Sequence, residues 1–263
     1  MAGIQIDGYF PDTSTTNGYF GWFHDAQFVI RLPDNWNGKL VITGAPGVRR
    51  QYANDYILSD WFVSRGYAYA STDKGNSGTS FHNDGVNPGD AIAEWHRRVT
   101  ELTVAAKEVV RQRYGALPAY TYMTGLSNGG YLTRYALENR PAAVRAAVAN
   151  IALIGRIGKP MITPHGTLDS LLPMSTNSDN YVAMIHGEGR GRLHRYYVVE
   201  AGNHVDQLYD EFPDKLRPIT SCYRAAFIAL ENWVQGKGNR KPPASKRIAR
   251  VAGTDLANQC SLD

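Results

Sequence analysis

Short β-rich runs alternate with helical runs along this chain, and this alternation limits the possible folds more than any other feature of the sequence. The β-rich runs are residues 26–32, 39–44, 67–72, 120–125, 146–155, 160–166 and 194–202, and the helical runs are residues 51–65, 90–114, 128–139, 175–187 and 217–235. Such alternation predicts an α/β fold with a mostly parallel, doubly wound sheet and helices on both faces. The first strands lack a helix between them, so we expect an antiparallel start.

A length of 263 residues is enough for one large core, and no linker interrupts the chain before residue 237. We therefore predict one domain over residues 1–236 and a basic C-terminal tail over residues 237–263. Residues 237–250 hold six basic and no acidic residues, whereas the rest of the chain has 22 basic and 24 acidic residues. A solvated tail is the favoured interpretation, with an anionic surface or polymer as the alternative; a nucleic-acid partner is not expected from a nearly neutral body.

No apolar run reaches the roughly 20 residues that a membrane span needs, so no membrane partner is expected. The N-terminus lacks the basic and apolar regions of a signal peptide. The two cysteines, Cys222 and Cys260, form no metal-binding pattern. A bridge between them would fasten the C-terminal tail to the body, while two separate thiols are the alternative. A bridge would indicate a protein that is secreted, with its signal peptide absent from this chain.

The most specific motif is G-x-S-x-G at residues 125–129, directly between a β-rich run and a helical run. In this strand–turn–helix context the glycines allow a tight turn, and Ser127 is exposed at its apex as a nucleophile. The following helix N-terminus favours negative charge near Ser127. The alternative is an ordinary turn serine.

A serine nucleophile needs a base, and in this type of fold the chain order is serine, acid, histidine. Asp169 lies in the loop after the run 160–166, and His204 follows the run 194–202. Both positions are at strand C-terminal ends, where open α/β sheets carry their sites. We predict Asp169 as the acid and His204 as the base.

Other residues compete for these two roles. Asp206 is close to His204 in the sequence, but a triad acid normally comes from another strand end. His165 lies next to the loop that carries Asp169; a packed strand histidine is the favoured interpretation, and a residue that lines the site is the alternative. The remaining histidines are less suitable, because they precede the nucleophile, lie inside a helix or flank a loop; they are His24, His82, His96, His186 and His194.

An oxyanion that forms during acyl transfer needs two backbone N–H donors. Asn128, the residue after the nucleophile, is the first predicted donor. The second should come from the loop after residues 39–44, where Pro46 has no N–H. Gly47 and Val48 remain, and Val48 is the favoured donor.

Several segments resemble the tannase and feruloyl esterase family, which has the α/β-hydrolase fold. They are GYAYASTDKGNSG (66–78), the helix 94–115, YTYMTGLSNGGY (120–131), HGTLDSLLP (165–173) and GNH (202–204). The resemblance covers residues 39–235. It implies a carboxylic-ester hydrolase with Ser127, Asp169 and His204 as its triad.

The chain also departs from that family's pattern. The family joins a Cys before the serine to a Cys after the histidine, where this chain has Leu126 and Val205. The family also inserts a lid, often with calcium, between serine and acid, but here only 42 residues separate Ser127 from Asp169. This spacing resembles lidless cutinases and polyester hydrolases, in which a C-terminal disulfide is common.

The sequence thus predicts a secreted serine esterase without metal or cofactor that acts on polyesters or bulky esters, such as poly(3-hydroxybutyrate), cutin-like or aromatic polyesters. We expect a monomer whose partner is an ester substrate, including a polymer surface. A feruloyl or tannin-type esterase acting on small phenolic esters is the alternative. A catalytically silent binding module is disfavoured, because all three triad positions are chemically intact.

Overall fold

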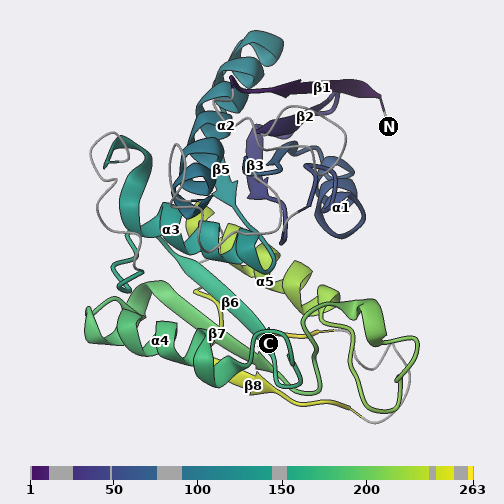
Figure 1. Ribbon diagram of the computed structural model, residues 1–263, viewed down its shortest axis with the longest axis vertical. Helices are drawn as coiled ribbons and strands as arrows, with labels where there is room; N and C mark the ends of the chain where they lie inside the picture. Colours follow the sequence, from purple (N-terminus) through teal and green to yellow (C-terminus); the bar gives the residue numbers. More distant parts are fainter. Residues whose placement is uncertain are drawn as a thin grey trace. The chain divides into compact units, whose positions relative to one another are not determined.

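The computed structural model describes residues 2–11, 26–47, 49–75, 91–143, 153–236, 241–251 and 260–262. The chain divides into two compact units, Met1–Ala152 and Leu153–Asp263. Each unit has a sheet of its own, and each is treated separately below (Figure 1). In the described part of the chain, no helix has the length and apolar character needed to cross a membrane.

The first unit contains a mixed five-stranded sheet in the order β1-β2-β4-β3-β5. Its strands are β1 (Gly3–Tyr9), β2 (Gln27–Pro33), β3 (Lys39–Gly44), β4 (Ala68–Thr72) and β5 (Tyr120–Met123). Strand β2 pairs antiparallel with β1 and β4, whereas β3 pairs parallel with β4 and β5. The predicted antiparallel start followed by parallel strands is therefore confirmed.

Helices cover this sheet on opposite sides in Figure 1. They are a π-helical turn (Asp55–Ser59) with α1 (Asp60–Val63), α2 (Ala91–Tyr114) and α3 (Asn128–Ala143). Helix α2 packs against β2, β3 and β4, while α1 packs against β2 and β4. Buried apolar side chains of α2, such as Leu102 and Val110, join those of the strands in one core, and this burial is the main stabilising contribution.

The second unit contains three parallel strands, β6 (Met161–Gly166), β7 (His194–Val199) and β8 (Lys246–Ile248), in that order. Its helices are α4 (Ser178–Gly187) and α5 (Thr220–Gln235), with short 3-10 turns at Met174–Thr176, Gly191–Leu193 and Asp206–Leu208. Helix α5 packs against β6.

Most elements lie where the sequence predicts them. The predicted helix over 51–65 is the main difference, because its ordered part begins at Asp55 with a π-helical turn and continues as the short α1. The predicted strand over 146–155 lies mostly outside the described residues, and residues 153–155 are not in a strand. Strands β1 and β8 were not predicted, since neither lies in a strand–helix repeat.

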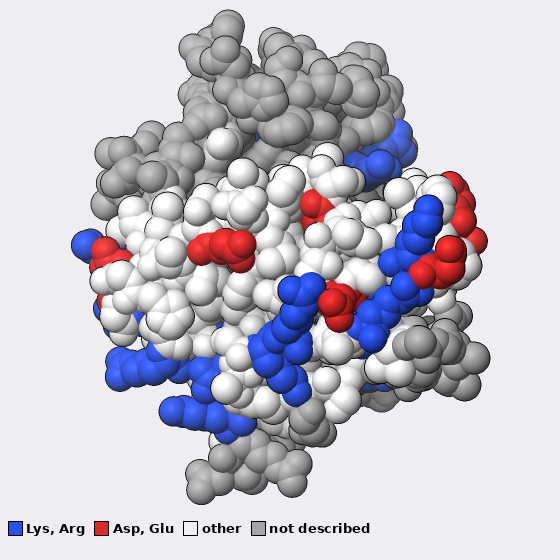
Figure 2. Space-filling view, turned by 90° about the horizontal axis from the view of Figure 1, so that it is seen from below, with Lys and Arg blue, Asp and Glu red and all other residues white. Residues whose placement is uncertain are grey.

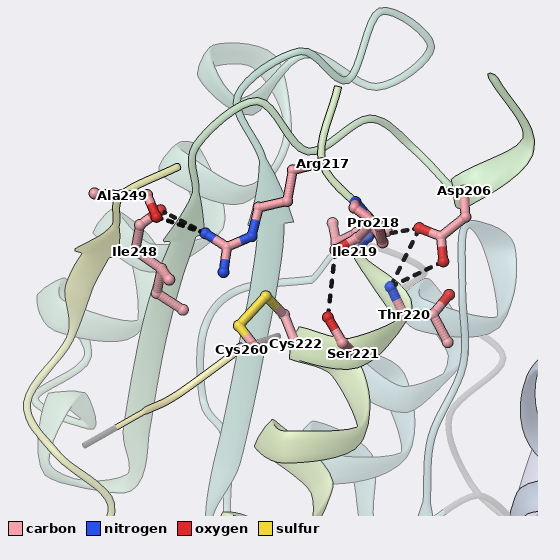
Figure 3. Close-up of a disulfide and its surroundings, with 10 residues drawn as sticks. All are labelled: Asp206, Arg217, Pro218, Ile219, Thr220, Ser221, Cys222, Ile248, Ala249 and Cys260. Atoms are coloured by element: carbon pink, nitrogen blue, oxygen red, sulfur yellow. Dashed lines mark hydrogen bonds between the residues drawn. A yellow bond between two sulfur atoms is a disulfide. The ribbon is translucent and has the colours of Figure 1, made fainter. Parts of the chain in front are cut away.

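The C-terminal segment is built into the second unit. Strand β8 pairs with β7, so this part of the basic segment is a strand of the sheet rather than a solvated tail. The predicted disulfide is present between Cys222 of α5 and Cys260, 38 positions apart (Figure 3). Cys222 is fully buried in a core with Tyr197 and Ile248.

Polar contacts also hold this segment in place. The buried guanidinium of Arg217 donates to the carbonyl of Ala249 at 2.7 Å, as Figure 3 shows. Arg247 pairs with Glu200 at 3.1 Å.

The face in Figure 2 carries Lys and Arg side chains interspersed with Asp and Glu. The charges drawn on this face therefore include both signs.

Candidate active site

Ser127 lies at a strained turn between β5 and α3. Its φ is 53°, in the left-handed region that non-glycine residues rarely adopt. Helix α3 begins at the next residue, and the Tyr131 N–H donates to the Ser127 carbonyl at 3.1 Å. Because such strain persists only where the surroundings impose it, and because it is concentrated at functional sites, the turn is a candidate for a nucleophile elbow.

The glycines of the motif allow backbone segments to come into close contact at this turn. A methyl group on Gly125 would lie 2.2 Å from the backbone carbonyl carbon of Gly129. A methyl group on Gly129 would lie 2.6 Å from the carbonyl oxygen of Gly44, the last residue of β3. Only glycine at both positions allows β3, β5 and α3 to approach this closely.

We therefore expect Gly125→Ala to destabilise the protein by about 1–3 kcal/mol, the usual cost of overpacking, because backbone rather than a flexible side chain must shift. Gly187→Ala is the control, since nothing lies within 4 Å of a methyl group there. Urea unfolding of both variants measures the effect. A Gly125→Ala variant as stable as Gly187→Ala would contradict the close approach.

Of the two predicted oxyanion donors, Asn128 is among the described residues and Val48 is not. Asn128 is the first residue of α3, and the first N–H groups of a helix have no acceptor within the helix. Its side-chain Nδ2 is buried and has no hydrogen-bond partner in the described part of the chain. Val48 lies outside the described residues, so its role stays a prediction. The alternative donor, Gly47, has a positive φ of 51°.

A buried lysine holds the loop that leads to this predicted donor. Lys74 is fully buried, and its Nζ donates to the carbonyls of Ala45 at 2.5 Å and Gly47 at 2.6 Å. Its ammonium also lies 4.9 Å from the ring centre of Trp95. A lysine after a strand would ordinarily be assigned to the surface, so this contact cannot be predicted from the sequence.

Burial changes the protonation of Lys74 and its neighbour. Desolvation lowers the pKa of Lys74 from 10.5 to about 7, although the charge of Asp73 opposes the shift. Desolvation raises the pKa of Asp73 from 3.8 to about 6. Between pH 7 and the ordinary lysine pKa, the unfolded chain thus binds a proton that the folded chain lacks, so stability rises with pH through Lys74.

We expect the free energy of unfolding of the unmodified protein, relative to Lys74→Met, to rise from pH 7 to pH 9. The slope is at most about 1.4 kcal/mol per pH unit, the limit for one proton. Urea unfolding at several pH values measures it, with Lys241→Met as the control, because Lys241 is exposed. A difference that stays flat or falls as pH rises would contradict a depressed Lys74 pKa.

In the second unit, the predicted acid Asp169 and the predicted base His204 are in contact. His204 Nδ1 lies 2.8 Å from Asp169 Oδ2. The other oxygen, Oδ1, accepts the backbone N–H groups of Leu171 at 3.1 Å and Leu172 at 2.8 Å. Asp169 is 8% exposed. A buried carboxylate held in this way orients the imidazole, with Nδ1 as the donor and Nε2 left for another partner.

Two glycines bring the acid and the histidine together. Gly166 ends β6, and a methyl group on it would lie 2.2 Å from the carbonyl oxygen of Gly202. The Leu168 N–H donates to that same carbonyl at 2.8 Å. The loop with Asp169 and the loop with His204 are thus joined directly. The sequence showed these glycines but not their contact.

Asp206, the competing acid, has a different role. It accepts the backbone N–H groups of Ile219 at 2.5 Å and Thr220 at 3.3 Å, and so caps the N-terminus of α5 (Figure 3). Negative charge is favourable at a helix N-terminus. Asp169 is therefore the carboxylate that contacts His204, and Asp206 stabilises a helix.

The other described histidines have structural contacts. His96 is stacked on Tyr135 with ring centres 3.3 Å apart, and burial lowers its pKa to about 4. His194 Nε2 lies 3.0 Å from Thr163 Oγ. His165 is buried, as the favoured interpretation has it, and it also contacts Asp169, which agrees with the alternative that it lines the site. His24 and His82 lie outside the described residues.

The described residues hold no group of three or more His, Cys, Asp or Glu side chains that could bind a metal ion. Ser127 lies in the first unit and the Asp169–His204 pair lies in the second.

Comparison with solved structures shows the fold. A dienelactone hydrolase-like promiscuous phosphotriesterase from metagenomic libraries aligns with a TM-score of 0.52 and 14% identity, over 80% of this chain and 92% of that chain. A Klebsiella pneumoniae protein named as a dienelactone hydrolase aligns with a TM-score of 0.51 and 11% identity, over 90% and 97% of the two chains. A puromycin-hydrolyzing peptidase from Mycobacterium tuberculosis aligns with a TM-score of 0.52 and 14% identity, over 84% of this chain and 38% of that chain. The fold is that of the α/β-hydrolases.

The sequence itself matches one family. Residues 23–139, which include the G-x-S-x-G turn, match the family described as tannase and feruloyl esterase. No curated protein sequence matches the chain. The family match supports an enzyme of the ester-hydrolase type.

Proposed function

We propose that the protein is a serine carboxylic-ester hydrolase with Ser127 as nucleophile, His204 as base and Asp169 as acid. The observation that carries the proposal is the 2.8 Å contact between His204 Nδ1 and the buried carboxylate of Asp169. The strained turn at Ser127 and the match to the tannase and feruloyl esterase family support it independently. The chain order of the three residues is that of the α/β-hydrolases.

In the proposed mechanism, His204 accepts the Ser127 proton through Nε2 while the serine oxygen attacks the ester carbonyl. The Asn128 N–H and a donor from the loop at Gly47 and Val48 stabilise the oxyanion. Lys74 keeps this loop in place through its two carbonyl contacts. His204 then protonates the departing alcohol, and water repeats the cycle on the acyl-enzyme. Asp169 stabilises the imidazolium of His204 during both formation and hydrolysis of the acyl-enzyme.

For the substrate, we favour polyesters and bulky esters over small ones. Exposed apolar side chains follow or precede the proposed catalytic residues closely along the chain: Leu168 is 48% exposed, Leu171 66%, Leu208 38% and Phe212 41%. Exposed apolar surface near a site favours contact with an apolar partner. The short spacing between Ser127 and Asp169, which leaves no space for a lid, favours a chain-like substrate as well.

The second candidate is a feruloyl or tannin-type esterase acting on small phenolic esters, which the family match favours. We also propose that the protein acts outside the cytoplasm, because a disulfide joins Cys222 to Cys260. A monomer remains our proposal for its oligomeric state.

Three substrates separate these candidates: p-nitrophenyl butyrate, methyl ferulate and a poly(3-hydroxybutyrate) film. We expect turnover of the butyrate ester and release of soluble products from the film. Turnover of methyl ferulate without any film hydrolysis would support the second candidate instead.

Variants at the exposed leucines sharpen this comparison. Leu171→Ser should lower film hydrolysis and leave p-nitrophenyl butyrate turnover nearly unchanged, because a small ester does not need the apolar surface. Leu117→Ser is the control, since Leu117 is 60% exposed but lies between α2 and β5. Equal film activity in both variants would contradict the role of the apolar surface near Asp169.

A further inference from the structure

A second histidine contacts the carboxylate of Asp169. His165 Nε2 lies 3.2 Å from Asp169 Oδ2 and 2.9 Å from the carbonyl oxygen of Leu172. His165 is 8% exposed and belongs to β6, the strand that leads to Asp169. A backbone carbonyl oxygen, such as that of Leu172, can only accept hydrogen bonds. Nε2 of His165 must therefore carry a hydrogen.

The other ring nitrogen of His165 begins a chain of three short contacts that ends at the surface. His165 Nδ1 lies 2.6 Å from Ser178 Oγ, and Ser178 Oγ lies 2.7 Å from the hydroxyl of Tyr196. The Tyr196 hydroxyl donates to Asp179 Oδ1 at 2.8 Å. Ser178 is fully buried, whereas Asp179 is exposed.

Each of these three contacts needs one hydrogen, and the available hydrogens can be counted. The Tyr196 hydroxyl has a single hydrogen, and it donates this hydrogen to Asp179 Oδ1. The contact between Ser178 and Tyr196 then needs the hydroxyl hydrogen of Ser178. The contact between Ser178 and His165 is left with only one source of hydrogen, which is Nδ1 of the ring.

A neutral His165 would leave one contact without a hydrogen. Ser178 would then have to donate to Nδ1, and the oxygens of Ser178 and Tyr196 would face each other at 2.7 Å with lone pairs only. A buried polar contact of this kind is costly.

We propose that His165 is a doubly protonated positioning residue: its Nε2 contacts the carboxylate of Asp169, and its Nδ1 donates to the hydrogen-bonded series Ser178, Tyr196 and Asp179. Its role in catalysis rests on the proposed function. Titratable groups that contact this network come from four places in the fold: Asp169 from the loop after β6, His204 from the loop after β7, Tyr196 from β7 and Asp179 from α4.

The imidazolium has two effects on the site. Its positive charge lies beside Oδ2 of Asp169, at 3.2 Å from Nε2, and this is the oxygen that also contacts His204 Nδ1. It also ties the Leu172 carbonyl, and with it the loop that carries Asp169, to β6. The position of His204 is thereby fixed through Asp169.

Nuclear magnetic resonance of the ring nitrogens tests the protonation directly. Long-range ¹H–¹⁵N spectra are recorded at neutral pH, and the His165 signals are assigned by their loss in His165→Gln. We expect both His165 nitrogens to show the shifts of protonated nitrogen. A signal of an unprotonated nitrogen from His165 in the unmodified protein would overturn the proposal.

Asp179→Asn provides the sharper test, because it changes one exposed side chain and keeps its shape. The amide can donate to Tyr196, Tyr196 can then donate to Ser178, and Ser178 can donate to Nδ1. His165 should become neutral, with Nδ1 unprotonated. Asp210→Asn, at another exposed position of the same unit, should leave His165 doubly protonated. Unchanged His165 signals in Asp179→Asn would overturn the proposed chain of hydrogen bonds.

Kinetics test the positioning role. With p-nitrophenyl butyrate, we expect His165→Ala to lower kcat about tenfold, as outer contacts of catalytic groups commonly do, with little change in KM. His165→Gln should recover part of the loss, because its amide can donate toward Asp169. An unchanged kcat in His165→Ala would overturn the role. If Ser127→Ala instead retained full activity, the proposed function would fail, while the nitrogen signals would still decide the protonation of His165.

Discussion

Ser127→Ala should reduce kcat for p-nitrophenyl butyrate by about 10⁴-fold or more, because no acyl-enzyme can form without the serine oxygen. Residual hydrolysis should come only from binding and oxyanion stabilisation. The Ser127 side chain is only partly buried, and the positive φ of this turn is as unfavourable for serine as for alanine. Folding should therefore change little, and circular dichroism of the variant should match that of the unmodified protein.

Ser175→Ala is the matched control, since Ser175 is exposed in the 3-10 turn before α4. Its kcat and KM should equal those of the unmodified protein. Hydrolysis by Ser127→Ala at more than a tenth of the normal rate, in a preparation free of other esterases, would be inconsistent with the proposed nucleophile.

Removal of the disulfide should have the largest effect on stability. The 38-residue separation of Cys222 and Cys260 corresponds to about 4 kcal/mol in the chain-entropy model, and native disulfides typically contribute about 2–5 kcal/mol. Cys222→Ala with Cys260→Ala should therefore unfold at a lower urea concentration. The first part to open should be the segment with β8, because the bond joins this segment to α5.

Reduction separates the bond from the packing of Cys222 in the core. The unmodified protein should lose stability in dithiothreitol, once a thiol assay confirms two free cysteines, whereas the double variant should not respond. The remaining difference between the reduced protein and the double variant is the cost of the smaller side chain in the core. Equal urea midpoints for the oxidised and reduced protein would contradict a stabilising role of the bond.

The part of the fold that the sequence predicts is the part encoded locally. Helix α2 and strands β3 and β4 have continuous runs with clear ends, such as the positive-φ Gly66 and Gly115 after helical turns. Strand β8 has three residues in a basic, proline-containing stretch, so its apolar pattern is too short to recognise. Its pairing with β7 depends on tertiary contacts, including that of Arg217 with Ala249.

The same distinction applies to the candidate site. The turn at Ser127 and the order of Asp169 and His204 can be predicted, because each follows a strand and the fold determines where such residues lie. Lys74 and His165 could not be assigned, since their partners are distant in the sequence: Lys74 contacts Ala45, 29 positions away, and His165 contacts Ser178, 13 positions away. A buried cation and a second histidine become visible only when these segments are folded together.

The central claim is that Ser127 is the nucleophile of an ester hydrolase, and covalent labelling tests it most directly. The protein is treated with diethyl p-nitrophenyl phosphate, the released p-nitrophenolate is counted per chain, and the labelled peptide is sequenced by mass spectrometry. We predict one equivalent of p-nitrophenolate, one diethylphosphoryl group on Ser127, complete loss of esterase activity, and no label on Ser127→Ala. Full esterase activity with no label, or a label on another residue that abolishes activity, would contradict the claim.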